Sequence, residues 1–253
     1  MAVVPVRLLI SGKMAVGKGT VSAYLVERHG ALLMPREQIV KPFVYAVAAG
    51  ERVFVLGALA ELFPGDPQAQ TQVLAAIDHF MESYEPEEGK KRRLLQRVID
   101  FVQERDPAAI ERALDSRIRA LDPPPRFVVI DDVRGLAAFD YFHRHGYRTL
   151  RVEADPQVCR ARMLARDGLI PPEAAFTHWT ETDLDQAPHE FLLRNDNERV
   201  AAACAGEIEA MAEHFRVHSP EARADLADYR ARIAALLDPL ADEPLAAEPF
   251  TAV

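Results

Sequence analysis

The sequence predicts an α/β protein in which helices flank a parallel β-sheet. Segments typical of buried strands occur at residues 6–11, 31–34, 127–131 and 190–193, and residues 147–152 alternate like a strand. Segments with helical apolar spacing alternate with most of these strand segments, and glycine or proline punctuates the junctions. Because parallel strands need long crossover connections, alternating strands and helices favour a parallel sheet.

The first elements are a strand over 6–11, a glycine-punctuated turn over 12–19 and a helix over 20–29 that stops at Gly30. A short strand over 31–34 is closed by Pro35. Residues 37–121 contain no convincing strand, and their proline and glycine breaks predict several helices. We therefore expect a helical insertion there, followed by a stiff D-P-P-P connector at 122–125.

The α/β pattern resumes with the strand at 127–131, F-V-V-I-D, and continues with a helix over 136–145 and a strand over 147–152. Further helices are expected from Asp155-Pro156 to Arg166, over 197–215, and from Ser219 onward. The predicted organisation is a core of residues 1–36 and 122–216 and an insertion of 37–121. A polar lid-like segment covers 167–187, and a C-terminal helix with an acidic tail covers 217–253.

Composition narrows the class of partner. The 253 residues carry a net charge of −9, which argues against binding a nucleic-acid duplex. The longest apolar stretch, 43–60, is interrupted by Glu51 and Arg52, so we expect no membrane span. Cys159 and Cys204 are read as two reduced thiols of a cytoplasmic protein, although two cysteines could also form one bridge. Whether the chain is a monomer or a homodimer stays open.

The sharpest motif is G-K-M-A-V-G-K-G-T at residues 12–20. It matches G-x-x-x-x-G-K, with glycine in the usual Ser/Thr position and Thr20 one step later. Gly12, Gly17 and Gly19 let the backbone wrap a phosphate closely, and the following helix offers its positive N-terminal end. Lys18 would reach the β- and γ-phosphates, and the Thr20 hydroxyl would bind a phosphate. The motif predicts an ATP-binding P-loop.

The G-K-G-T ending resembles the nucleoside monophosphate kinase branch of P-loop proteins, which implies a P-loop NTPase-type sheet, an acceptor-binding insertion and a lid. The S-G-K opening resembles deoxynucleoside monophosphate kinases of the phage type and animal-type phosphomevalonate kinases. The resemblance implies that Lys13 is a second cation near the γ-phosphate; the alternative is a solvated loop lysine. Asn195, after the last apolar run, would border the adenine or simply end a strand.

A second motif, V-V-I-D-D-V-R, ends the strand at 127–131. An aspartate at a strand end beside the loop can hold Mg²⁺ or its waters. The D-V-R string resembles the same family, which implies that Asp132 lies near the acceptor phosphate or metal and that Arg134 binds phosphate. Asp131 is the rival for the metal role, and a strand-end turn with a surface salt bridge is the alternative.

Further arginines complete the predicted site. The order R-x-L-L-Q and then R-D-P resembles the family's acceptor-binding region, which implies acceptor contacts for Gln96 and Arg105, and more loosely for Arg93. Arg36, just past the second strand, is another acceptor candidate. The helix C-R-A-R-M-L-A-R-D-G resembles a lid entry, which implies that Arg162 and Arg166 assist the moving phosphoryl group. For each arginine, a solvated surface position is the alternative.

The expected activity is transfer of the ATP γ-phosphoryl group, with Mg²⁺, to a small phosphorylated acceptor. A (deoxy)nucleoside monophosphate is the first choice, and dephospho-CoA or phosphomevalonate are alternatives. A non-catalytic protein that binds or senses a nucleotide is the alternative of another class. The sequence does not separate ATP from GTP as donor.

Overall fold

Two units of the chain have separate cores. The computed structural model describes residues 5–85, 92–177 and 182–242. Met1–Leu33 and Asp122–Val253 form an α/β unit, and Met34–Leu121 form a helical unit. The tail predicted at the C-terminus, from residue 243, and residues 178–181 of the predicted lid-like segment lie outside the described residues.

A five-stranded parallel sheet organises the α/β unit, in the order β2-β3-β1-β4-β5. Its strands are β1 (Val6–Ser11), β2 (Leu32–Leu33), β3 (Phe127–Ile130), β4 (Arg148–Glu153) and β5 (Phe191–Arg194). The predicted parallel sheet with flanking helices is confirmed. Because β1 is central, with β3 and β4 as its neighbours, the loop that follows β1 emerges in the middle of the sheet's carboxyl edge.

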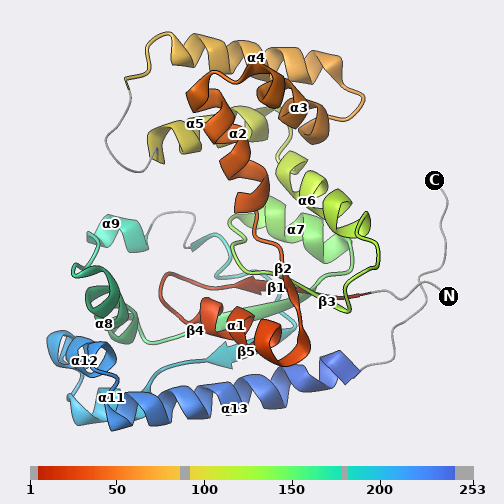
Figure 1. Ribbon diagram of the computed structural model, residues 1–253. Helices are drawn as coiled ribbons and strands as arrows, with labels where there is room; N and C mark the ends of the chain where they lie inside the picture. The colour runs from red at the N-terminus through yellow and green to blue at the C-terminus, as the bar shows by residue number, and fades with distance from the viewer. Residues whose placement is uncertain (1–4, 86–91, 178–181, 243–253) are drawn as a thin grey trace. The chain divides into compact units, whose positions relative to one another are not determined.

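Helices cover both faces of this sheet (Figure 1). The helices of this unit are α1 (Lys18–His29), α7 (Leu136–Arg144), α8 (Pro156–Asp167), α9 (Glu173–Phe176), α11 (Glu198–Ala203), α12 (Ile208–Arg216) and α13 (Pro220–Asp242). Helices α1 and α13 lie on one face and α7 on the other (Figure 1). Leu8 and Ile10 of β1 pack in one buried cluster with Leu25 of α1 and Ile233 of α13. Alternate strand residues therefore face α1 and α13.

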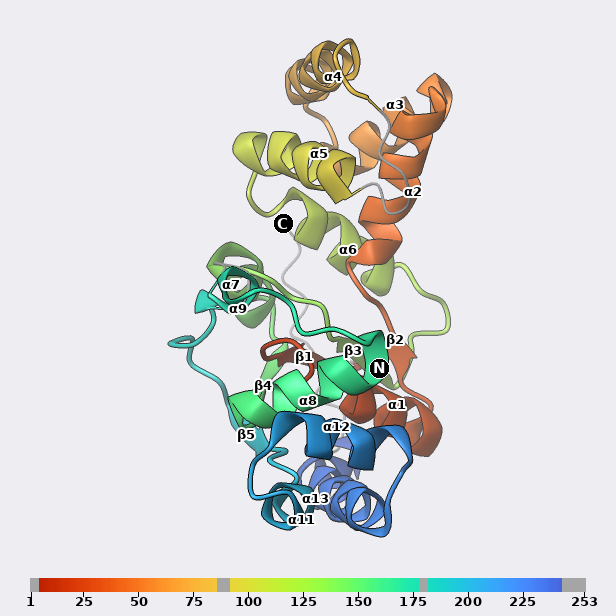
Figure 2. The ribbon, with the colours of Figure 1, turned by 90° about the vertical axis from the view of Figure 1, so that its left-hand side faces the viewer.

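The single helix predicted over 197–215 is wrong. The chain forms α11 and α12 instead, with Ala205 at φ 47° and Gly206 at φ 80° between them. Two successive left-handed residues reverse the chain, which no α-helix accommodates. Helix α12 then packs beside α8 (Figure 2), where Met211 and Ala212 share a buried cluster with Ala161. Cys159 and Cys204 are buried free thiols, so the alternative of a bridge does not apply.

The helical unit consists of α2 (Glu37–Ala49), α3 (Arg52–Leu62), α4 (Pro67–Met81), α5 (Arg92–Arg105) and α6 (Ala109–Arg119). Its core contains Phe43, Leu62, Val98 and Ile110, which line a small internal space. Asp66 caps α4 by accepting a hydrogen bond from the Ala69 amide (2.9 Å). Among the described helices of the whole chain, each is too short or too polar to cross a membrane.

Candidate functional site

The glycine loop, residues 12–17, is pressed against the carboxyl ends of β4 and β5. Gly12 has φ 144° and Gly17 has φ 110°. A Cβ atom on Gly12 would lie 2.4 Å from the Val152 carbonyl oxygen, and one on Gly17 would lie 2.3 Å from Nδ2 of Asn195. Both the backbone angle and the close approach therefore require glycine at these two positions.

Lys18 is the first residue of α1, and its ammonium group lies across the glycine loop. Nζ donates hydrogen bonds to the carbonyl oxygens of Gly12 (2.6 Å) and Lys13 (2.9 Å). The N-cap of α1 is Gly17, which has no side chain to occupy the first-turn amide groups. A positive helix end and a cation thus meet at one loop, which is the arrangement that binds phosphate groups.

Asp131 follows β3 directly and reaches α1. Its Oδ2 accepts a hydrogen bond of 2.6 Å from the hydroxyl of Ser22, whose Oγ lies 3.3 Å from the Lys18 carbonyl oxygen. Asp132 and Arg134 lie in the turn after Asp131 and are partly buried. The hydrogen bond to Ser22 therefore ties one of the two rival aspartates to the helix that begins at the glycine loop.

Arg162 of α8 ties the glycine loop to the end of β5. Its guanidinium donates 2.8 Å hydrogen bonds to the carbonyl oxygens of Ala15 and Asn195, and it also bonds to the side chain of Asn197. Burial lowers the pKa of this guanidinium. The Asn195 side chain completes the tie by donating to the Val16 carbonyl oxygen (2.8 Å). These contacts fix the shape of the loop from outside.

A cavity of about 440 Å³ opens beside the start of α1. Five residues predicted for the site line it, namely Gly17, Thr20, Arg162, Arg166 and Asn195. Arg166 is largely exposed and forms an ion pair with its neighbour Asp167 (2.6 Å). The structure thus brings the loop, the α8 arginines and the β5 end together around one space.

Sequence reasoning missed several residues of the same cavity. Phe215 and Arg216 come from the end of α12, and Tyr229 comes from α13. The Tyr229 hydroxyl donates to the Gly17 carbonyl oxygen (3.4 Å), and burial raises the pKa of this phenol. Nothing in the local pattern around these positions signals a site, because the contact spans 212 residues of chain.

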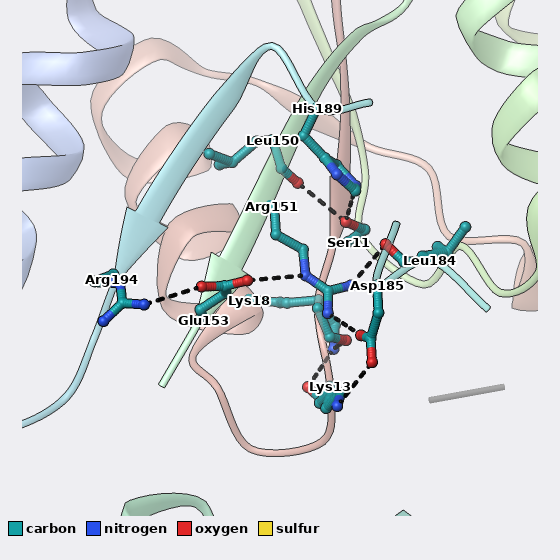
Figure 3. A network of polar contacts seen from close by, with 11 residues as sticks. Ser11, Lys13, Lys18, Leu150, Arg151, Glu153, Leu184, Asp185, His189 and Arg194 are labelled. Carbon is teal, nitrogen blue, oxygen red and sulfur yellow. Dashed lines mark hydrogen bonds and ion pairs between the residues drawn. The ribbon is translucent and has the colours of Figure 1, made fainter. Parts of the chain in front are cut away.

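A second cavity, of about 670 Å³, lies on the other side of the glycine loop and is lined by Lys13, Arg151 and Asp185. Figure 3 shows these side chains in one polar network at the ends of β4 and β5. Lys13 Nζ lies 3.0 Å from one oxygen of Asp185, and Arg151 lies 2.5 Å from the other. Lys13 is therefore ion-paired, and the sequence had not singled out Arg151 or Asp185.

Ser11, immediately before the glycine loop, contacts His189 (Figure 3). Ser11 Oγ and His189 Nε2 are 2.6 Å apart. Burial lowers the pKa of His189, which favours a neutral imidazole around pH 7. A neutral ring nitrogen can accept a hydrogen bond from the Ser11 hydroxyl. This hydrogen bond holds the chain before β5 against the end of β1.

Four of the five residues predicted for an acceptor, all except Arg134, lie in the helical unit. Arg36 forms an ion pair of 2.6 Å with Glu111, a fully buried residue of α6. Arg93 and Gln96 are exposed on α5, and Arg105 pairs with Asp66 (3.7 Å). At about 3.6 residues per turn, Gln96 and Arg105 lie on opposite sides of α5. The structure does not bring this pair to one face.

In the part of the chain that the structure describes, no three His, Cys, Asp or Glu side chains gather as a metal-binding cluster. The fold and the loop define the chain as an α/β protein with a parallel five-stranded sheet and a glycine-rich loop between its central strand and first helix.

Comparisons with known proteins find a weak structural likeness and no family. No protein-family model matches the chain, and no curated protein matches it. Among solved structures, the chain is similar to the crystal structure of TT1252 from Thermus thermophilus, with 18% sequence identity and a TM-score of 0.41. The match covers 85% of this chain and 98% of that chain. A likeness this weak carries no argument about activity.

Proposed function

We propose that this chain is a cytoplasmic ATP-dependent phosphotransferase that moves the γ-phosphoryl group to a phosphate on a small acceptor. The observation that carries the proposal is the glycine loop itself. It follows the central strand, has glycines at φ 144° and 110°, and leads into α1 with Lys18 across it. These features support a P-loop that wraps a triphosphate with backbone amides and one ammonium group.

The cavity beside Thr20 supports a nucleoside triphosphate as the donor. The triphosphate would occupy the glycine loop, and the base and sugar would enter the space of about 440 Å³ next to it. Phe215 supplies an aromatic surface there, and Asn195 and Asn197 supply polar atoms. Asparagine amides both donate and accept hydrogen bonds, so these side chains suit the edge of adenine or of guanine, and the donor is ATP or GTP.

The residues beside the glycine loop fit a magnesium ion. Mg²⁺ in phosphate-transfer sites commonly takes one or two carboxylates and completes its shell with phosphate oxygens and waters. Asp131 supplies one carboxylate next to α1, and its contact with Ser22 makes it our choice over Asp132. When bound, the ion would neutralise charge on the transferred group.

The reaction proposed is displacement at phosphorus. An oxygen of the acceptor phosphate forms a bond to the γ-phosphorus, and the bond from that phosphorus to the β-phosphate oxygen breaks, so the nucleoside diphosphate leaves. Lys18 would hold the phosphates, and Arg166, on the exposed end of α8, would stabilise the transferring charge. Arg162 would act as a positioning residue, because it bonds to the loop backbone at Ala15.

Several small phosphorylated molecules fit the acceptor role. A (deoxy)nucleoside monophosphate is our first choice, and dephospho-CoA and phosphomevalonate are alternatives within the class. Arg134 and Arg93 stay candidates for acceptor contacts, and so does either Gln96 or Arg105, because these two lie on opposite sides of α5. Arg36 is a weaker candidate than the sequence suggested, because Glu111 holds it in the core of the helical unit.

One observation favours a different class, a protein that binds a nucleotide without transferring phosphate. Arg162 is committed to the loop backbone, Arg36 to Glu111 and Arg166 to Asp167. If these contacts persist with nucleotide bound, few cations are left for the transition state. Binding without turnover would identify this class.

Two measurements test the proposal. Calorimetry with magnesium and ATP or GTP should give a dissociation constant in the parent that Lys18→Ala weakens by about 10-fold or more, since it removes a charged contact. Lys41→Ala is the control, because Lys41 pairs with Glu37 on the surface of the helical unit. A coupled assay across nucleoside monophosphates, dephospho-CoA and phosphomevalonate then identifies the acceptor. Absence of nucleotide binding in the parent defeats the proposal.

A further inference from the structure

The end of β4 carries an arginine that is unusual for its position. Arg151 lies on the strand beside β1, where its Cα is in register with Ser11, the residue before the glycine loop. Only 8% of its side chain is exposed. A buried guanidinium needs a partner for its charge, because desolvation of an isolated cation is costly. Its partners therefore indicate what the position is built to hold.

The main partner is a carboxylate that Arg151 shares with Lys13. One Asp185 oxygen lies 2.5 Å from Arg151 and the other lies 3.0 Å from Lys13 (Figure 3). The Leu184 carbonyl oxygen also accepts from Arg151 (3.4 Å). Two cations from different elements thus hold two oxygens of one anion between them. A phosphoryl group also presents negatively charged oxygens, at a similar spacing, to such a pair.

The cavity around this pair has room for an anion, but its lining carries more negative than positive side chains. Five carboxylates line it, against three cations: Glu153, Asp155, Asp185, Asp196 and Glu198 against Lys13, Arg151 and Arg194. Of the five, Asp185 is the one that contacts both Lys13 and Arg151. A Glu153 oxygen lies 3.8 Å from Arg151 as well. An anion that approached both cations would compete with Asp185, and it would bind between them only if that carboxylate moved away.

We propose that Lys13 and Arg151 form a second phosphoryl-binding site beside the glycine loop, which Asp185 occupies until a phosphorylated ligand displaces it. The site takes a terminal phosphate or pyrophosphate group. Its location next to the loop makes the γ-phosphate of the donor the natural occupant, and this part of the inference rests on the proposed function. Asp185 then acts as a competitor built into the chain, and it lowers the affinity of the empty protein for anions.

Inorganic pyrophosphate is the probe, because it needs no nucleotide pocket. Calorimetry on the full chain should show that Asp185→Asn binds pyrophosphate about 10-fold more tightly than the parent, within the range of energetic coupling between competing groups. The gain should shrink at high salt, because it arises from charge. The control is Glu198→Gln, which removes the same charge from another element, α11, in the same cavity lining.

Double variants locate the site. The gain from Asp185→Asn should disappear when Lys13→Gln or Arg151→Gln is added, because either change removes one of the two cations. Thermal unfolding checks that each variant folds, and Lys13→Gln serves if the buried Arg151 cannot be replaced, since the Lys13 side chain is 45% exposed.

Two results overturn the inference. Either Asp185→Asn binds pyrophosphate no more tightly than the parent and Glu198→Gln, or its gain survives the loss of Lys13. The proposed function fails independently, when the parent neither binds nor consumes a nucleoside triphosphate. The pyrophosphate series gives its own answer in that case.

Discussion

Gly17 and Gly19 differ in how much space surrounds them. Gly17 has φ 110° and faces Asn195 and Tyr229, whereas a Cβ on Gly19 would meet nothing within 4 Å. Gly17→Ala should lower the free energy of unfolding by about 2–5 kcal/mol, from left-handed strain and overpacking together. It should also weaken binding of magnesium nucleotide. Urea unfolding and calorimetry measure the two effects.

Gly19→Ala is the matched control for stability. Gly19 lies inside α1, where alanine is favoured over glycine by up to about 1 kcal/mol, so the variant should be as stable as the parent or slightly more so. Equal destabilisation by the two substitutions would show that the contacts around Gly17 do not limit the loop.

The sequence predicted residue types at the site better than residue partners. Glycine at 12 and 17 and lysine at 18 follow from the spacing of one motif. That Arg162 bonds to Ala15 could not be read from the chain, because 147 residues separate the two. Likewise, Arg36 looked like a free loop arginine until α6 placed the buried Glu111 beside it. Pairing depends on tertiary packing, which a local pattern does not encode.

At the scale of elements, two of the three arginines of α8, Arg162 and Arg166, have different surroundings. Arg162 is partly buried and bonds to the backbone of the glycine loop, whereas Arg166, one turn later, is largely exposed and pairs with Asp167. Arg162→Met should lower the free energy of unfolding by about 2–4 kcal/mol, because it removes the donor to two partly buried backbone carbonyl oxygens. Arg166→Met should stay within about 0.5 kcal/mol of the parent.

The two arginines should also differ in their effect on activity, and here Arg166 should have the larger effect on kcat. On the proposed function, Arg166→Met lowers kcat with little change in stability, and Arg162→Met weakens nucleotide binding through the loop it supports. Urea unfolding and initial rates at saturating substrate distinguish these outcomes. If Arg162→Met proved as stable as the parent, Arg162 would not be the support of the loop.

Most elements were predictable because each follows a local rule. Strand β3 is a continuous apolar run, and β1 is apolar apart from Arg7 and Ser11. Gly30 and Gly168 end α1 and α8 in left-handed conformations. The split between α11 and α12 was missed because the apolar spacing runs on through Ala205, a residue that favours helices. Gly206 is the residue that indicates a helix end here, whereas the alanine before it favours a continuous helix.

At the scale of the whole α/β unit, α13 is a part of the core rather than an appendage. Ile233 and Leu237 are fully buried in the cluster that contains β1 and α1 residues. Asp238 accepts from the Tyr24 hydroxyl (2.9 Å) and lies 2.8 Å from His29, so polar contacts also hold α13 to α1. The sequence predicts an amphipathic helix there, but the pattern does not predict which surface its apolar face packs against.

Replacing Ile233 tests this role of α13. Ile233→Ala leaves a cavity next to the sheet and should lower the free energy of unfolding by about 2–5 kcal/mol, as for other buried aliphatic side chains. The neighbouring Arg232→Ala is the control, because that side chain is exposed and its loss should cost less than about 0.5 kcal/mol. Urea unfolding of both variants measures the difference.

Since Tyr229 of the same helix contacts Gly17, Ile233→Ala should also weaken nucleotide binding, whereas Arg232→Ala should not. Equal stability of the two variants would mean that α13 is dispensable for the core.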